Sequence, residues 1–166
     1  MSNEAVTPVS MSRRIEAPAS AVFAVLTDPA KHPEIDGSGM LRPGGPVSTV
    51  TKVGDVFTMH MFFPDMGDYQ MDNHVVAFEK DALIAWEPVM HGADPTVDDP
   101  QRNGSRWSFS LAPDGPDATV VTETYDCSGS PEQVRAAIDN GRGWIDAMTT
   151  TLANIEALCA GGGSGS

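Results

Sequence analysis

The sequence has few basic residues and few cysteines. Of its 166 residues only 10 are Lys or Arg, against 23 Asp or Glu, so the formal net charge is −13. Apart from the adjacent Arg13 and Arg14, the basic residues are scattered along the chain. A chain of this charge without a basic patch repels nucleic acid and anionic membrane surfaces. We therefore set nucleic acid aside as a partner.

Long apolar runs are also missing. No run approaches the roughly 18 residues of a membrane span, and the first residues carry neither the basic nor the apolar segment of a secretory signal. The two cysteines, Cys127 and Cys159, are too few for a disulfide framework and fit a reducing compartment. We expect a cytoplasmic protein without a membrane span.

The four histidines lack the spacing of a metal site, and neither cysteine has a Cys or His within a few residues. Phosphate-binding and nucleophile-elbow motifs are absent as well, so we expect no metal and no cofactor. His60 and His74 fall on the outer face of predicted strands, where we expect solvated side chains. For His32 and Asp36, helix capping and surface solvation are preferred over a shared role at the entrance of a binding site.

The composition that remains, 40% hydrophobic and 20% charged, is that of one globular domain. We place this domain at residues 1–160. The last six residues, Gly161 to Ser166, contain only Gly and Ser and are interpreted as a flexible linker outside the domain.

Apolar and polar residues alternate over residues 7–16, which predicts a first strand. Ala17-Pro18 then opens a short helix, with the proline at its first position, and a second helical turn is expected at 31–35. A loop rich in glycine and proline follows. Further on, turn sequences separate strands expected at residues 48–53, 55–63, 68–79, 82–90, 105–112 and 118–127, which predicts antiparallel hairpins. The longer connection 92–104 is interpreted as a surface loop.

The C-terminal part predicts one long helix. Ser130-Pro131-Glu132-Gln133 matches a capping box, and apolar residues follow at spacings of three and four as far as Ala160. At 1.5 Å per residue this helix would be roughly 45 Å long, and only a curved sheet in this chain can cover its apolar face. Gly141 lies on that face and allows two interpretations. One is open volume beside the helix; the other is a kink or a tight contact between helix and strand.

The order of these elements is that of the helix-grip fold. Ile15-Glu16-Ala17-Pro18, Val22 to Pro29 and His32-Pro33-Glu34-Ile35-Asp36 resemble the N-terminal motif of the START-like SRPBCC superfamily, and within it the polyketide cyclase/dehydrase and lipid-transport group. Two later segments, Thr119 to Tyr125 and Gly143-Trp144 with Leu152, resemble its penultimate strand and its C-terminal helix. The resemblance implies an α+β fold: a seven-stranded curved antiparallel sheet around a long C-terminal helix, with two short helices after the first strand and an apolar cavity between sheet and helix.

Alternation along the strands predicts which side chains line this cavity. The expected ligand-binding residues are Phe57, Met59, Met61, Tyr69, Met71, Trp86, Trp107, Phe109, Trp144 and Met148. Nine methionines is a high number for this length, and four of them fall on the predicted inner face. Core packing explains each methionine singly, whereas the cluster favours a pocket that adapts to an apolar ligand.

The polar residues on the inner face give two alternatives. Glu123 is expected to point inward, and a buried carboxylate must be paired, hydrogen-bonded or protonated. Arg13 falls on an apolar face of the first strand, which the helix-grip topology places beside the last strand. A partly buried Arg13–Glu123 ion pair is the preferred interpretation. In the alternative, Glu123 is a general acid/base, and Asn73 and Tyr125 hold a carbonyl or hydroxyl of the ligand.

Three functional hypotheses follow. The first is binding or carriage of a lipid-like or polyketide-like small molecule, apolar or aromatic, in the cavity. The second is a cyclase or dehydratase that uses Glu123 as acid/base, and the third is a partner-binding module that uses the acidic surface. A Glu123 paired with Arg13 favours binding, whereas a free and desolvated Glu123 favours catalysis. The identity of the ligand and the oligomeric state stay open.

Overall fold

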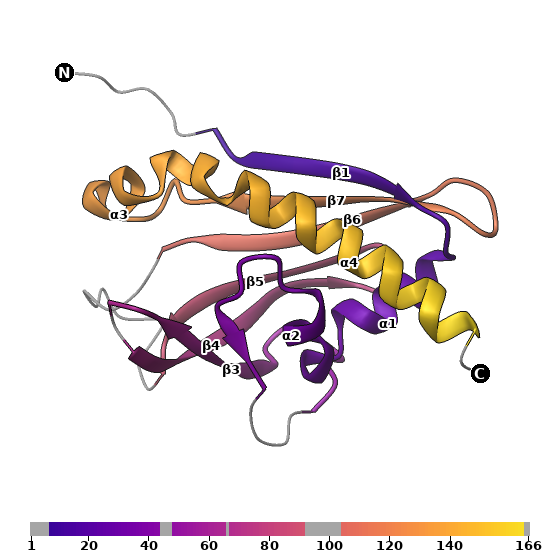
Figure 1. Ribbon diagram of the computed structural model, residues 1–166, viewed down its shortest axis with the longest axis horizontal. Coiled ribbons are helices and arrows are strands. Elements are labelled where there is room, and N and C mark those ends of the chain that lie inside the picture. The colour runs from indigo at the N-terminus through magenta and orange to yellow at the C-terminus, as the bar shows by residue number, and fades with distance from the viewer. Residues whose placement is uncertain (1–6, 44–47, 66, 92–103, 165–166) are drawn as a thin grey trace.

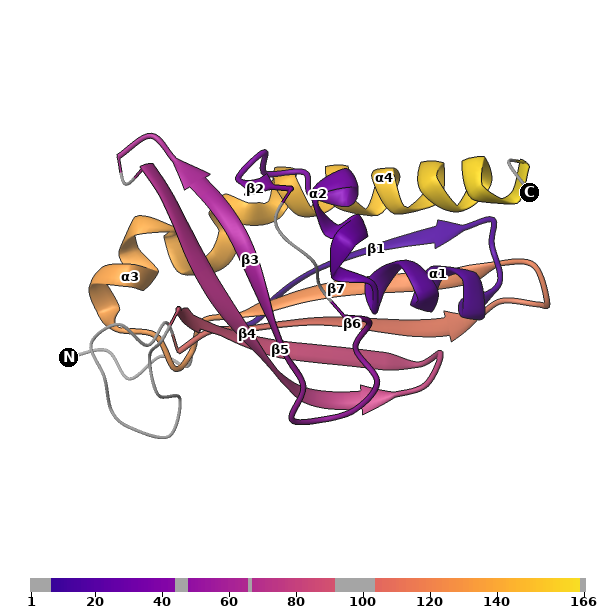
Figure 2. The same cartoon turned by 90° about the horizontal axis from the view of Figure 1, so that it is seen from below.

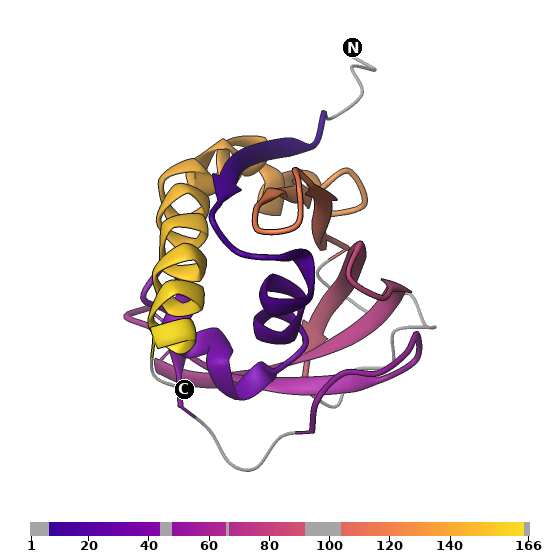
Figure 3. The ribbon, with the colours of Figure 1, turned by 90° about the vertical axis from the view of Figure 1, so that its right-hand side faces the viewer.

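The computed structural model describes residues 7–43, 48–65, 67–91 and 104–164. Within these ranges seven strands form one antiparallel sheet in the order β1-β7-β6-β5-β4-β3-β2. The strands are β1 (Val9–Ile15), β2 (Leu41–Arg42), β3 (Val56–Phe63), β4 (Gly67–Glu79), β5 (Leu83–Met90), β6 (Arg106–Pro113) and β7 (Thr119–Asp126). The sheet curves around the long helix α4 (Ile145–Ser164), as Figures 1 and 3 show. The predicted fold class is confirmed.

Two short helices follow β1, as expected. They are α1 (Ala19–Leu26) and α2 (His32–Ile35), joined by the 3-10 turn η1 (Pro29–Lys31). Pro18 is the N-cap of α1 and not its first helical residue, so the helix begins one position later than expected. Helix α2 and strand β2 lie between β3 and α4, so this N-terminal segment covers part of the concave side of the sheet (Figure 2).

The pairing register decides which side chains face inward. Strands β3 and β4 form a continuous hairpin from Val56 opposite His74 to Phe63 opposite Gly67, which places Met59 opposite Met71 on the inner face. A register shift between Val75 and Ala77 of β4 interrupts the ladder with β5. Because such irregularities bend and twist a strand, this one contributes to the curvature of the sheet.

Two groups of buried residues make the core. The larger one packs α1 and the C-terminal half of α4 against the sheet and includes Ile15, Leu26, Val121, Leu152 and Ile155. The smaller group lies near the start of α4 and consists of Tyr125, Cys127 and Met148.

The expected strand at residues 48–53 is wrong. Val50 donates its N–H to the carbonyl of Thr27 at the end of α1, and Thr51 donates its N–H to the carboxylate of Asp55, so these backbone groups bind outside the sheet. Val53, which the alternation placed in a strand, is 55% exposed. The additional strand is the two-residue β2, inside the segment expected to be loop.

The single long helix is also wrong. The chain forms α3 (Glu132–Ala137), the 3-10 segment η2 (Asp139–Trp144) and then α4, with φ values of 51°, 55° and 95° at Asp139, Asn140 and Gly141. A Cβ on Gly141 would lie 2.9 Å from the Tyr125 ring, so this glycine marks both a kink and a tight contact with a strand. The capping box does not form, because the N-cap is Pro131 and no side chain caps α3. Helix α4 runs to Ser164, into the expected linker.

The predicted surface loop at 92–104 falls almost entirely outside the described residues. In the part of the chain that is described, none of the helices is long and apolar enough to cross a membrane.

Candidate ligand-binding cavity

A cavity of about 450 Å³ lies between the concave face of the sheet, the α2–β2 segment and the start of α4. Its walls are mostly apolar. They include six of the nine methionines and all three tryptophans of the chain. The lining residues are His32, Ile35, Asp36, Ser38, Met40, Leu41, Met59, Met61, Tyr69, Met71, Asn73, Trp86, Pro88, Met90, Trp107, Phe109, Glu123, Tyr125, Val134, Trp144, Ala147, Met148 and Thr151.

Nine of the ten expected ligand-binding residues lie on this wall, and so do Glu123, Asn73 and Tyr125. Most of them come from β3, β4, β6 and β7, where alternation sends every second side chain inward. Phe57 is the exception. It is 4% exposed and lies behind the wall, where its ring packs edge-on against His32 and Trp86 at centroid distances of 5.4 and 5.3 Å.

The sequence reasoning missed the part of the wall between α2 and β2. This segment is fastened to α4 by two hydrogen bonds: Gly37 N–H donates to Thr151 Oγ1 (2.9 Å), and Asn154 Nδ2 donates to the Ile35 carbonyl (3.2 Å). A Cβ on Gly37 would lie 2.2 Å from the Ala147 carbonyl oxygen, so only glycine allows this approach. The glycine-rich composition was the available signal, but it was interpreted as an ordinary loop.

Aromatic rings form two groups around the cavity. In one group Trp107, Tyr125 and Trp144 pack together, with centroid distances between 4.4 and 6.2 Å. In the other, Trp86 contacts His32 at 5.6 Å and Phe109 at 5.9 Å. The two groups are neighbours on the sheet, because Trp86 pairs with Trp107 across β5 and β6. Such rings present wide, stiff apolar surfaces that suit a planar or aromatic ligand.

Glu123 is a buried acid on this wall. It lies on β7 opposite Phe109 and Met11, is 5% exposed, and its Oε1 has no hydrogen-bond partner among the described residues. Desolvation raises the pKa of Glu123 to about 8, and the negative charge of Asp36 adds to this shift. The carboxyl group is therefore mostly protonated at neutral pH and is able to donate a hydrogen bond.

The expected ion pair between Arg13 and Glu123 is wrong. Arg13 lies opposite Val121, two residues along β1 from the position next to Glu123. Its guanidinium group reaches outward to Glu156 of α4, with Nη2 2.7 Å from Oε1. The charge that was expected to neutralise Glu123 is thus used at the surface.

Asn73 and Tyr125 line the same cavity as Glu123. Tyr125 lies two residues from Glu123 on β7, whereas Asn73 lies on β4, on the other side of β5 and β6. Asn73 is 2% exposed, and its Nδ2 donates to the carbonyls of Phe57 (3.3 Å) and Met71 (3.4 Å), which fixes the amide. Burial raises the pKa of the Tyr125 phenol, so this group is neutral at physiological pH. Glu123, Asn73 and Tyr125 are thus polar residues on a wall that is mostly apolar.

His32 is buried in the wall and Asp36 is half-buried there, so the expectation of surface solvation is wrong for His32. His32 is 3% exposed, its Nε2 lies 2.8 Å from the carbonyl oxygen of Leu26, and desolvation lowers its pKa. Asp36 accepts hydrogen bonds from the N–H and Oγ of Ser38 and from the N–H of Leu41, which closes the turn into β2.

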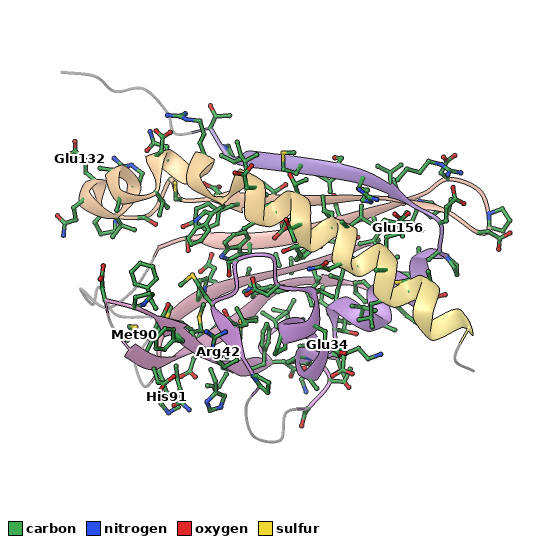
Figure 4. The ribbon with its side chains drawn as sticks, in the orientation of Figure 1. Glu34, Arg42, Met90, His91, Glu132 and Glu156 are labelled. Atoms are coloured by element: carbon green, nitrogen blue, oxygen red, sulfur yellow. The ribbon has the colours of Figure 1, made fainter. Side chains whose placement is uncertain are left out.

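A more polar hollow adjoins the cavity. The two share Met61, Tyr69 and Met90, and the hollow is otherwise lined by Arg42, Pro43, His60, Asp68, Gln70 and His91. Figure 4 shows Met90, Arg42 and His91 gathered at the end of the sheet that lies away from the C-terminus. Here the cavity meets the polar surface. The described residues contain no group of three or more His, Cys, Asp or Glu that could hold a metal ion.

Comparison with known sequences identifies the family. The profile of the family described as polyketide cyclase / dehydrase and lipid transport matches residues 7–160. The chain belongs to this family. This agrees with the resemblance seen in the sequence motifs and with the helix-grip arrangement of the elements.

Individual relatives show how much of the chain the similarity covers. Uncharacterized protein Rv0088 of Mycobacterium tuberculosis is 31% identical over 156 residues, which cover 92% of this chain and 61% of that protein. The chain thus spans about three fifths of the length of the curated relatives it matches.

Solved structures agree in fold. Protein NE0264 of Nitrosomonas europaea has a TM-score of 0.71 at 15% identity, covering 97% of this chain and 99% of that one. A point mutant of norcoclaurine synthase from Thalictrum flavum, in complex with a transition state analogue, has a TM-score of 0.57 at 13% identity, covering 93% and 94%.

Proposed function

We propose that this protein binds a neutral apolar or aromatic small molecule in the cavity between the sheet and α4. The observation that carries the proposal is the cavity itself, about 450 Å³ enclosed by methionines and all three tryptophans. This volume lies in the range of small-molecule sites. The family description names lipid transport, and one structural neighbour holds a transition state analogue, which supports a fold that accommodates small organic molecules.

The charges on the wall favour a neutral ligand. Neither Lys nor Arg is among the residues that line the described cavity. A ligand anion would be buried beside the carboxyl groups of Asp36 and Glu123 without a cation to neutralise it. The desolvation free energy of the anion would then exceed the gain from its apolar contacts. A neutral molecule with an apolar body and a few polar atoms matches the wall instead.

The test uses a neutral naphthyl ketone dye, prodan, whose emission shifts to the blue in apolar surroundings. Because all three tryptophans line the cavity, bound dye also quenches their fluorescence. We expect saturable one-to-one binding that Ala147→Phe, which fills the cavity, weakens at least tenfold. Ala157→Phe, at an exposed position of the same helix, is the matched control and leaves binding unchanged. Equal binding by both variants, or no saturable binding, contradicts the proposal.

A second candidate, a proton-transfer enzyme of the cyclase or dehydratase type, is favoured by Glu123. This acid is desolvated, has a pKa of about 8 and has an unpartnered Oε1 on the cavity wall. Such a group donates and recovers a proton near neutral pH. In the dehydration of a β-hydroxy ketone it would protonate the departing hydroxyl. The C–O bond breaks and water leaves. The carboxylate then regains a proton from the carbon next to the carbonyl as the C=C bond forms.

The aldol adduct of benzaldehyde and acetone tests this chemistry, because its dehydration gives an enone that absorbs in the ultraviolet. We expect the wild type to form the enone and Glu123→Gln to lose this activity while it still binds prodan. If Glu123→Gln is as active as the wild type, Glu123 is not the acid. If the wild type binds the dye but forms no enone from the adduct, the binding function stands alone.

A further inference from the structure

His32 presents a hydrogen-bond acceptor that the protein itself does not use. The Leu26 carbonyl oxygen, 2.8 Å from Nε2, can only accept, so Nε2 carries the hydrogen. Burial of the ring lowers its pKa and keeps it neutral, which leaves Nδ1 with a free lone pair. Nδ1 is buried and has no hydrogen-bond partner in the part of the chain that the structure describes.

The ring cannot satisfy Nδ1 by turning. Rotation would break the bond to Leu26, and the ring is held between Trp86, which stacks on it at 5.6 Å, and Phe57, which contacts its edge at 5.4 Å. The tautomer and the direction of the lone pair are thus fixed by neighbouring elements. A buried acceptor without a partner is uncommon and is costly unless something donates to it.

We propose that His32 Nδ1 forms a subsite of the cavity that accepts a hydrogen bond from a hydroxyl or N–H group of the ligand. The subsite rests on the proposed function and narrows the class of ligand. His32 lines the same cavity as Glu123, whose protonated carboxyl group donates rather than accepts. The pair therefore selects a neutral molecule with a donor group at one position and a carbonyl or ether oxygen at another.

The experiment compares β-naphthol with its methyl ether, two probes that differ in the O–H donor. Each is titrated at pH 7 as a competitor of prodan. For the wild type we expect β-naphthol to bind about fivefold more tightly, the effect of one hydrogen bond to a buried acceptor.

Two variants separate the two nitrogen atoms of His32. The amide nitrogen of Gln is as many bonds from Cβ as Nε2, so His32→Gln keeps the donor to Leu26 and removes the Nδ1 acceptor. The amide oxygen of Asn is as many bonds from Cβ as Nδ1, so His32→Asn keeps the acceptor and loses the bond to Leu26. Both variants should melt below the wild type, because each removes the buried ring, and His32→Gln should melt higher than His32→Asn. We expect His32→Gln to lose the preference for β-naphthol and His32→Asn to keep it.

The subsite is overturned if β-naphthol and its methyl ether have nearly equal dissociation constants in the wild type, or if their ratio is unchanged in His32→Gln. The proposed function then still stands, since both probes displace the dye. If neither probe displaces prodan, or if prodan does not bind, the proposed function fails and the subsite falls with it. Nitrogen NMR of wild-type protein with labelled histidine needs no variant. The Nδ1 resonance of His32 should move with β-naphthol and not with the ether, and an identical response to both contradicts the subsite.

Discussion

Arg13 of β1 is bonded to Glu156 of α4, with its Nη2 2.7 Å and its Nε 3.1 Å from the same carboxylate oxygen. The other oxygen of Glu156 accepts from the backbone N–H of Glu16 (3.3 Å), so the contact ties the end of β1 to the helix (Figure 4). This pair lies at the surface, with side chains 42% and 26% exposed. It leaves the acid in the cavity, Glu123, without a cation from the part of the chain that the structure describes.

We expect the Arg13–Glu156 pair to contribute little to stability. Arg13→Met and Glu156→Gln should each lower the free energy of unfolding by about 0.5 kcal/mol, because exposed ion pairs are screened by water and salt. In a double-mutant cycle measured by urea unfolding, the coupling should stay below about 1 kcal/mol. The titration of Glu123, followed by NMR, should be the same in Arg13→Met as in the wild type. A clear rise of its pKa in that variant would show that Arg13 does act on Glu123.

Glu123 should make the protein less stable as the pH rises. Its pKa is about 8 in the folded chain and near 4.5 when exposed, so between these values the folded state holds a proton that the unfolded state has lost. The free energy of unfolding should therefore fall as the pH rises from 4.5 to 8, by roughly 5 kcal/mol at most, and level off above. Glu123→Gln should remove this slope in urea unfolding at several pH values. A variant with the same slope would mean that another group causes it.

The sequence predicts the strand part of the cavity well and the remaining part poorly, for a physical reason. In a strand, alternation alone places Met59, Tyr69 and Glu123 on one face once the strand is recognised. His32 belongs to a helical turn that is too short to show an apolar periodicity. It lines the cavity only because α2 packs against α4. The partner of Arg13 was missed because it lies on α4, whose path depends on the break in the C-terminal helix. That break is hidden by an apolar pattern that continues across Gly141.

His32 should act on stability in the opposite direction to Glu123. Burial lowers its pKa below the usual 6.5, so in acid the unfolded chain takes up a proton before the folded chain does. The contribution of the neutral, buried His32 to the free energy of unfolding is therefore fully present above pH 6.5 and is lost as the pH falls below this value. Because Glu123 titrates in an overlapping range, the measurement belongs in the Glu123→Gln background. There the free energy of unfolding should decline from pH 6.5 to 5, and His32→Gln added to that background should flatten the decline. An unchanged decline would mean that His32 is not the group responsible.

Gly141 should tolerate no side chain, because it combines a left-handed backbone with a tight contact. Its φ is +95°, and an added Cβ would lie 2.9 Å from Tyr125 Cδ2 and 3.2 Å from Val9 Cγ2. Gly141→Ala should lower the free energy of unfolding by about 3 kcal/mol, from backbone strain and overpacking together. Gly115→Ala is the control, because Gly115 has a φ of +87° and nothing within 4 Å of the added atom, so it should cost about 1 kcal/mol.

Since Tyr125 lines the cavity, Gly141→Ala should also weaken prodan binding and change the near-ultraviolet circular dichroism, whereas Gly115→Ala should change neither. Equal costs for the two variants would show that the Tyr125 ring moves aside freely, and the break in the helix would then owe nothing to this contact.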